Sequence, residues 1–560
     1  MKKELLKVSV IYIFIEILFF GRNFLNEYIA GDFLRFWVPN YHFILTSIKS
    51  GILPLWQPYA FLGVPGIFHP GHTFFYPLLW IFFLINFIFN LTLKFNFLGK
   101  TLELYQYLHL LIGAISMYYL LRKKLNLSIF ASFFSGFIYV FSLLTITELG
   151  ALQPLQGKMY LPLIIYFLID FLQNSTFKNY FFLVLINVFL LSFGYPYYIV
   201  YFFYAELGLA VFYGVKSIFK TGIVLANAIL LAGFFLLPQL HILTQAARFN
   251  EGDINPNFHT AFSPIGTHII SMLIPQGIYP DASLFWGTIP FIFLILGLFS
   301  LKKTKFNLWL VSIFLISLPL SLGGYLNIQK TLGGFPFFFD KFRTHGQIGI
   351  LIFFSGTIFI AFGIEKILKG LKNNKIYLAL WGFYLSILLL MLFLPFFRRN
   401  YLVDQKDFLV ALGRMTIFFG AGLVICHLAS LQKNKTLIII ALLLTFLEFY
   451  FYYTKIAYLK GGTTYQKYFE KNSLIPEIPN KDNLFRYMFS NNQFAYNTSY
   501  MKVFQYLGYD STPYVGPYSL ARFGNPKSFE IANVKYGIGI VLDEKKPGIK
   551  LIKTINPVEH

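Results

Sequence analysis

Long apolar runs separated by short basic gaps constrain this chain more than any other feature of its sequence. Fourteen such runs, rich in Phe, Ile and Leu, follow one another between about residues 8 and 454, each with a length that suits a membrane helix or part of one. Only 12% of the 560 residues are charged, against about 25% in a soluble globular domain. A water-soluble chain of this length would need more polar surface to cover its core. The sequence therefore predicts a polytopic integral membrane protein.

The distribution of positive charge predicts how the runs are oriented. A net charge of +22 would suit a nucleic-acid binder, but the Lys and Arg residues collect in the gaps between apolar runs. Cytoplasmic loops of membrane proteins have this character, so no nucleic-acid partner is expected. Even numbers of crossings separate the basic clusters, which places them on one side. The longer loops 241–285, 324–345 and 397–407 then share the opposite, external face.

One early segment breaks this alternation. With a cytoplasmic N-terminus, three full crossings before the basic triplet 122–124 would place that triplet outside. We therefore expect segment 73–91 to be re-entrant or interfacial, the alternative being a miscounted helix. The first run is expected to remain as a signal anchor, because the small residues of a cleavage site are not suitably placed. The prediction is an all-α bundle of about thirteen transmembrane helices in the cell (cytoplasmic or inner) membrane.

The chain changes character near residue 455. Residues 1–455 form the predicted multi-pass membrane domain, which includes a long first external loop at 22–72. Residues 456–560 are polar, with frequent Pro, Gly and Asn. Strand-like runs at Tyr536–Leu542 and Ile549–Ile555 flank a segment with hairpin-turn residues. We therefore expect a small external α+β domain at the C-terminus.

The motifs of soluble enzymes are absent from the sequence. It has no Gly-rich phosphate loop, no G-x-S-x-G, no H-E-x-x-H and only one cysteine, Cys426. The most unusual stretch is the first external loop, which mixes charged, His and Trp residues with many Pro and Gly. Residues 33–48 allow an amphipathic helix along the membrane interface, with Trp37 and Tyr41 at the headgroups. A loop with this much structure is rarely a simple connector.

The first loop carries a resemblance to a known family. The pattern G-D-x-x-x-x-x-x-P at 31–39, followed by S-G-I-L-P-L-W-Q-P-Y and F-L-G-V-P, resembles the opening of bacterial YfhO-like membrane proteins. That family is related to the GT-C superfamily of lipid-dependent glycosyltransferases, which implies a GT-C-like fold. Weaker similarities continue to Asn533–Tyr536. The chain departs from the family where Thr344 and His345 replace a typical Pro-Arg, and longer members continue further, which implies an abbreviated external domain.

The resemblance implies an inverting glycosyltransferase that acts on the outer face. A polyprenyl-phosphate sugar would be the donor, and a cell-envelope glycan or lipid would be the acceptor. In GT-C enzymes an acidic residue of the first external loop is the general base, and Asp32 matches that position. A carboxylate activates an acceptor hydroxyl by taking its proton, and a single displacement needs one such base. The alternative for Asp32 is a solvated loop acid or a helix N-cap.

A lipid phosphate leaving group calls for a cation near the membrane surface. Arg343 ranks first, because its planar guanidinium suits phosphate, and Lys341 and Arg248 lie on the same predicted face. Arg343 has two alternatives, a headgroup anchor or an ion pair with Asp340. The other partners expected are membrane lipids.

Several further polar residues are candidate substrate contacts. Trp56 and Gln57 offer an aromatic face and an amide, which suit a sugar, although Trp56 also suits turn packing at the interface. Glu148 and Gln153 stand at an external helix end, where they either extend the cavity or are ordinary interfacial residues.

His69 and His72 resemble a metal pair, but their i,i+3 spacing crosses a Pro-Gly turn and has no carboxylate nearby. They are kept as substrate contacts with no metal assigned, and a divalent metal is not favoured. No cofactor beyond the lipid-linked donor is implied. Glu206 and Glu448 fall inside apolar runs and are either functional or satisfied by internal hydrogen bonds.

Two other functions compete with sugar transfer. A transporter or flippase of lipid-linked envelope precursors would favour paired Gly/Pro-broken helices and midplane charges, a pattern that the sequence does not show. A non-catalytic envelope-assembly protein would use its outer loops and tail to bind partners, and fold alone does not exclude it.

Overall fold

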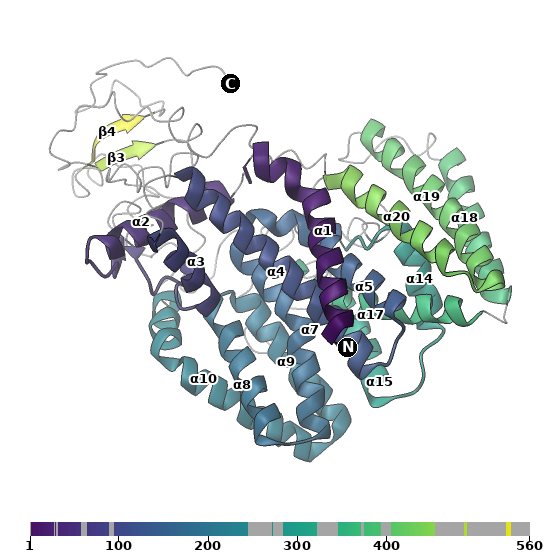
Figure 1. Cartoon of the computed structure of the whole chain (residues 1–560), viewed down its shortest axis with the longest axis horizontal. Coiled ribbons are helices and arrows are strands. Elements are labelled where there is room, and N and C mark those ends of the chain that lie inside the picture. Colours follow the sequence, from purple (N-terminus) through teal and green to yellow (C-terminus); the bar gives the residue numbers. More distant parts are fainter. Residues whose placement is uncertain are drawn as a thin grey trace.

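The computed structural model describes residues 2–26, 28–29, 32–57, 64–88, 95–244, 272, 284–321, 345–370, 374–393, 405–453, 486–489 and 534–538. Within these ranges the chain is almost entirely helical (Figure 1). The main helices of the bundle are α1 (Lys2–Asn26), α4 (Phe95–Lys124), α5 (Ile129–Phe141), α7 (Leu152–Gln173), α8 (Phe177–Ser192), α9 (Pro196–Tyr213), α10 (Val215–Thr244), α14 (Thr288–Leu298), α15 (Lys305–Ser321), α17 (Gly349–Lys369), α18 (Asn374–Phe393), α19 (Gln405–Gln432) and α20 (Lys435–Tyr453). The other helical elements are η1 (Phe33–Trp37), α2 (Val38–Lys49), η2 (Pro70–His72), α3 (Pro77–Ile88), α6 (Leu143–Ile146), η4 (Thr147–Gly150) and η8 (His345–Ile348).

The helices have the length and composition of a multi-pass membrane protein. Among the described residues, seven helical spans are long and apolar enough to cross a bilayer, and five further apolar helices are shorter. Exposed side chains along α1, α10 and α20 are largely hydrophobic, as expected for surfaces that face lipid. The multi-pass prediction is therefore confirmed, whereas the count of thirteen crossings stays a prediction.

Most helix positions agree with the apolar runs to within a few residues. Two departures matter for the functional site. The run expected at 129–147 is broken at Ser142, where α5 ends and α6 starts. Helix α7 begins at Leu152, six residues before the expected start, because its first two turns are polar and the apolar pattern does not detect them.

Cross-helix hydrogen bonds define two ends of the bundle. At one end, Glu4 of α1 accepts from Arg122 of α4 at 2.9 Å, and Lys124 pairs with Asp170 of α7. The backbone N–H of Ser128, before α5, meets a carboxylate at the end of α17. We call this the basic end, because Arg122, Lys124 and Lys369 form their ion pairs there.

The opposite end is called the loop end, because the first loop enters and leaves the bundle there. The backbone N–H of Ile29, just after α1, donates to Glu103 near the start of α4 at 3.1 Å. Gln153 at the start of α7 donates to the carbonyl oxygen of Phe193 after α8 at 2.7 Å. The backbone N–H of Thr288, at the start of α14, donates to Glu448 near the end of α20 at 2.9 Å. Successive long helices therefore alternate in direction between the two ends.

The first loop packs as a folded layer at the loop end. Turn η1 and helix α2 form one helical stretch, as expected, and α2 and α3 lie beside α4 (Figure 1). The interfacial role predicted for Trp37 and Tyr41 is wrong, because both are buried within the protein, at 5% and 0% exposure. Helix α3 has 12 described residues, and the re-entrant or interfacial course expected for segment 73–91 stays a prediction.

Two strand pairs complete the described elements. Strands β1 (Trp56–Gln57) and β2 (Val64–Pro65) form an antiparallel pair inside the first loop. Strands β3 (Arg486–Phe489) and β4 (Val534–Ile538) form a parallel pair in the tail. Strand β4 overlaps the predicted run Tyr536–Leu542. The expected hairpin partner at 549–555 lies outside the described residues, so the α+β domain stays a prediction.

Helices α14 and α17 cross at two glycines. A Cβ on Gly297 would lie 1.8 Å from the carbonyl oxygen of Phe359, and one on Gly363 would lie 1.9 Å from that of Phe293. These obstacles are backbone atoms, so no side-chain rotation relieves them. Small residues at such contacts allow the backbones of membrane helices to pack closely.

Gly297→Ala should therefore destabilise the protein by about 1–3 kcal/mol, through overpacking of the α14–α17 contact. The matched control is Gly222→Ala in α10, where no atom lies within 4 Å of an added Cβ. That control should be neutral or slightly stabilising, because Ala favours helix over Gly. The measurement is the temperature at which the detergent-solubilised protein loses its monomeric gel-filtration peak. Equal midpoints for the two variants would contradict the close crossing.

Candidate functional site

Asp32 stands at the loop end, directly before η1. Its side chain is exposed, and its backbone is already helical (φ −64°, ψ −27°) with no capping hydrogen bond from the side chain. The N-cap alternative is therefore not the one that the structure uses. Turn η1 packs against η4, the short turn that carries Glu148. Asp32 thus begins the element that joins the first loop to the bundle.

Buried hydrogen bonds hold the first loop in shape. The Tyr41 hydroxyl in α2 donates to the carbonyl oxygen of His72 at 3.0 Å and also contacts the Thr73 hydroxyl. Burial raises the pKa of the Tyr41 hydroxyl well above its usual range, so it stays a neutral donor. This contact ties α2 to the turn that follows η2, which fixes the two halves of the loop to each other.

The two candidate histidines bond to the backbone of the loop. His72 Nδ1 lies 2.7 Å from the carbonyl oxygen of Gly66, an acceptor, so this nitrogen carries the proton. His69 Nδ1 accepts from the backbone N–H of Gly71 at 3.1 Å. Both side chains are 1% exposed. These contacts give them a structural role in the turn, and substrate contact stays a prediction.

Gly66 permits the tightest approach in the loop. A Cβ at this position would lie 1.8 Å from the carbonyl oxygen of Pro54. Its N–H bonds the carbonyl oxygen of Leu55 at 2.7 Å, next to the β1–β2 pair. In that pair Gln57 is fully buried and Trp56 is 55% exposed. Of these two candidates, only Trp56 presents its side chain to the outside.

A second set of hydrogen bonds fastens the loop to the helices. The Tyr76 hydroxyl lies 2.9 Å from His109 Nε2 in α4 and 2.5 Å from the Tyr160 hydroxyl in α7. His109 Nδ1 donates to the carbonyl oxygen of Tyr105 at 2.7 Å, so Nε2 accepts from Tyr76 when the imidazole is neutral. The loop is therefore bonded to both α4 and α7.

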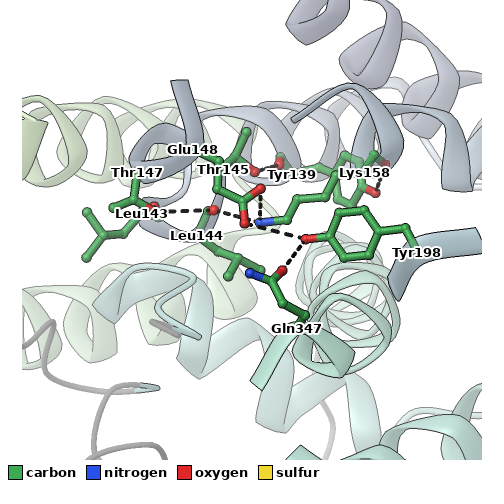
Figure 2. Close-up of polar contacts among 9 residues, drawn as sticks. All are labelled: Tyr139, Leu143, Leu144, Thr145, Thr147, Glu148, Lys158, Tyr198 and Gln347. Carbon is green, nitrogen blue, oxygen red and sulfur yellow. Dashed lines mark hydrogen bonds and ion pairs between the residues drawn. The ribbon is translucent and has the colours of Figure 1, made fainter. Parts of the chain in front are cut away.

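The structure also places a buried ion pair at the loop end (Figure 2). The Lys158 ammonium of α7 lies 2.6 Å from Glu148 Oε2 and donates to the carbonyl oxygen of Leu144 at 3.0 Å. The Tyr198 hydroxyl of α9 donates to Gln347 Oε1 at 2.6 Å and reaches Glu148 Oε1 at 3.4 Å. All four side chains are buried, with exposures between 0% and 9%. We call Glu148, Lys158, Tyr198 and Gln347 the Glu148 cluster.

A break in the helix creates the place for this cluster. Helix α5 ends at Ser142, and the chain continues through α6 and η4 to an extended Ala151. The Thr145 hydroxyl donates back to the carbonyl oxygen of Tyr139 at 2.8 Å, a group that the interrupted helix would leave unpaired. The carbonyl oxygen of Leu144, a second backbone group next to the break, accepts a hydrogen bond from the Lys158 ammonium. The break therefore brings Glu148 over the first turns of α7.

Sequence reasoning missed three members of the cluster. It singled out Glu148 but not Lys158, Tyr198 or Gln347. A signal existed for Lys158, an ionisable residue at the start of an expected crossing and far from the basic gaps. Gln347 and Tyr198 offer no such signal, because their role depends on α9 and η8 meeting in space.

The remaining candidates divide into two groups. Gln153 donates to the carbonyl oxygen of Phe193, which makes it a helix-packing contact between α7 and α8. Arg343, Lys341 and Arg248 lie outside the described residues. Within the described ranges, no three of His, Cys, Asp and Glu gather into a possible metal site.

The two intramembrane acids have internal partners. Glu206 accepts from the Asn187 amide at 3.2 Å, and Glu448 accepts from the backbone N–H of Thr288 at 2.9 Å. Each acid therefore has at least one internal hydrogen bond, and a functional role for either stays a prediction.

Comparison with known proteins finds a distant likeness among solved structures. No protein-family model matches the sequence, and no curated protein matches it. Among solved structures, the crystal structure of ArnT from Cupriavidus metallidurans bound to undecaprenyl phosphate is similar over 94% of this chain and 89% of that chain. The TM-score is 0.48 and the sequence identity 13%. A likeness this distant carries no inference about the activity, site or ligand of this chain.

Removing one charge of the Glu148 cluster should destabilise the protein strongly. Lys158→Met leaves the Glu148 carboxylate buried without its cation, a change that costs about 3–5 kcal/mol in comparable pairs. The double variant Lys158→Met with Glu148→Gln removes the uncompensated charge and should recover part of the loss. Thermal midpoints in detergent measure both effects. A Lys158→Met midpoint equal to that of the wild type would show that the pair does not stabilise the bundle.

Proposed function

We propose that this chain is a GT-C-type membrane glycosyltransferase. It would transfer a sugar from a polyprenyl-phosphate carrier to a cell-envelope acceptor on the outer face of the membrane. The single observation that carries the proposal is the position of Asp32, an exposed carboxylate at the start of a helical turn that packs on the bundle. The resemblance of the loop around it to YfhO-like proteins supplies the reaction class.

The setting of Asp32 suits a general base. An exposed carboxylate is ionised at neutral pH and can accept a proton from an acceptor hydroxyl as the hydroxyl attacks. The base must also be held in position relative to the donor. The hydrogen bonds of Tyr41, Tyr76 and His72 supply that rigidity, because they fix the loop to itself and to the helices.

The departing lipid phosphate needs a cation, and Arg343 is the candidate. It precedes Gln347 by four residues, so chain length alone keeps the two Cα atoms within roughly 14 Å. Gln347 belongs to the Glu148 cluster, and η1 after Asp32 packs on the turn that holds Glu148. The same buried cluster therefore anchors the chain near both proposed reacting groups. Lys341, two residues before Arg343, is the second candidate, and Arg248 is the third.

Lys158 does not serve as this cation in the proposal. Its ammonium is buried against Glu148 and the carbonyl oxygen of Leu144, so its charge is already compensated. We assign the Glu148 cluster a positioning role. It joins η4, α7, α9 and η8 into one support for the site.

The test compares Asp32→Asn with wild type in purified protein, using labelled polyprenyl-phosphate sugars and candidate envelope acceptors. Loss of the base should lower transfer by about 10²–10⁴-fold, the usual contribution of general base catalysis. The control is Asp170→Asn, an acid of the basic end that pairs with Lys124, which should retain transfer within a few-fold.

Transfer that survives Asp32→Asn would remove Asp32 as the base. Movement of lipid-linked precursors across the membrane of reconstituted vesicles, without any transfer of sugar, would show a flippase instead. Partner binding with neither transfer nor movement would show an assembly protein.

A further inference from the structure

An apolar groove runs between α14 and α18. It has a volume of about 430 Å³ and is lined by seven apolar side chains, Phe291, Ile295, Phe299, Ile376, Ala379, Leu380 and Phe383. Phe299 is 72% exposed and Phe383 is 39% exposed, so the groove lies at the surface of the described structure. Around a membrane bundle, the medium that meets such a surface is lipid hydrocarbon.

The lining and the length of the groove suit a hydrocarbon chain. Residues 291, 295 and 299 are four apart and occupy one face of α14, over a length of about 12 Å at 1.5 Å per residue. All seven lining side chains are apolar and offer no hydrogen-bonding partner. A hydrocarbon chain needs none, so the lining of the groove suits one.

Exposed lysines flank the basic end of this groove. Lys302 and Lys303 follow α14 within four residues of Phe299, and both are exposed. On the other side, the Lys433 side chain lies beside Gly370, just before α18, with its Cε 3.0 Å from a Cβ built there. The nearby carboxylate, Glu365, is already bonded to Lys369 and to the backbone N–H of Ser128. An anionic headgroup at this end would therefore meet several positive charges.

We propose that the α14–α18 groove binds one acyl chain of an anionic phospholipid, whose headgroup lies against Lys302, Lys303 and Lys433. The proposal combines two independent features, an apolar groove sized for a chain and a cationic end to the same groove. Basic pockets between helices at a membrane surface recognise acidic lipids in this way. The site is separate from Asp32 and lies at the opposite end of the bundle.

Native mass spectrometry of the detergent-solubilised full chain tests the proposal, with phosphatidylglycerol and phosphatidylcholine of identical acyl chains as probes. Wild type should retain phosphatidylglycerol preferentially. Lys302→Gln with Lys303→Gln should lower its affinity roughly tenfold or more, because each lysine near an acidic headgroup contributes about fivefold. The control is Lys178→Gln with Lys216→Gln, which removes two exposed charges from the same end on α8 and α10.

A second pair of variants tests the groove itself. Ala379→Trp fills the groove without changing charge and should abolish retention of either lipid at this site. Leu378→Trp, at the preceding position, should leave lipid retention unchanged, because Leu378 is 74% exposed and does not line the groove. Equal retention of the two lipids by wild type, unchanged binding in Ala379→Trp, or an equal loss in the Lys178/Lys216 control would each overturn the proposal.

Discussion

The buried contact between Lys158 and Glu148 is the interaction on which the loop end of the bundle depends. Taking two opposite charges out of water is costly, and the cost is recovered only when their other hydrogen-bonding groups are also satisfied. Here the Lys158 ammonium also donates to the carbonyl oxygen of Leu144, and the Tyr198 hydroxyl lies 3.4 Å from a carboxylate oxygen of Glu148. The pair forms because the helix before it breaks at Ser142 and turns Glu148 back over α7. A local interruption thus determines where four helical elements meet.

The first loop depends on this arrangement. Turn η1 packs on η4, and α2 and the following turns are bonded to one another and to α4 and α7 through Tyr41, Tyr76 and His109. Buried hydrogen bonds thereby fix parts of a loop of Pro, Gly and polar residues to the helices. The base role proposed for Asp32 depends on this fixation, because catalysis requires the base to be positioned before the acceptor arrives.

Much of the helical architecture could be predicted from the sequence, because apolar periodicity and basic gaps are local signals. The runs near α8, α9 and α19 agree with the structure to within a few residues. Buried polar segments are where this reasoning failed. The early start of α7 was missed, and Trp37 and Tyr41 were placed at the interface although they are enclosed by protein.

The cluster around Glu148 was only partly predictable for the same reason. A glutamate at a helix end is visible in the sequence, but its partners come from helices far along the chain. The i,i+3 spacing of His69 and His72 also says nothing of the backbone groups that they bond. The cationic candidates, with Arg343 first, remain predictions from the sequence alone.

We propose that a lipid phosphate and its acceptor meet at the loop end, which is built on the Glu148 cluster. A cryo-electron microscopy map of the protein in lipid nanodiscs with a polyprenyl phosphate would locate the phosphate. We expect phosphate density at the loop end, between Asp32 and the chain that leads into Gln347. Phosphate density at the basic end, with the loop end occupied only by solvent, would contradict it.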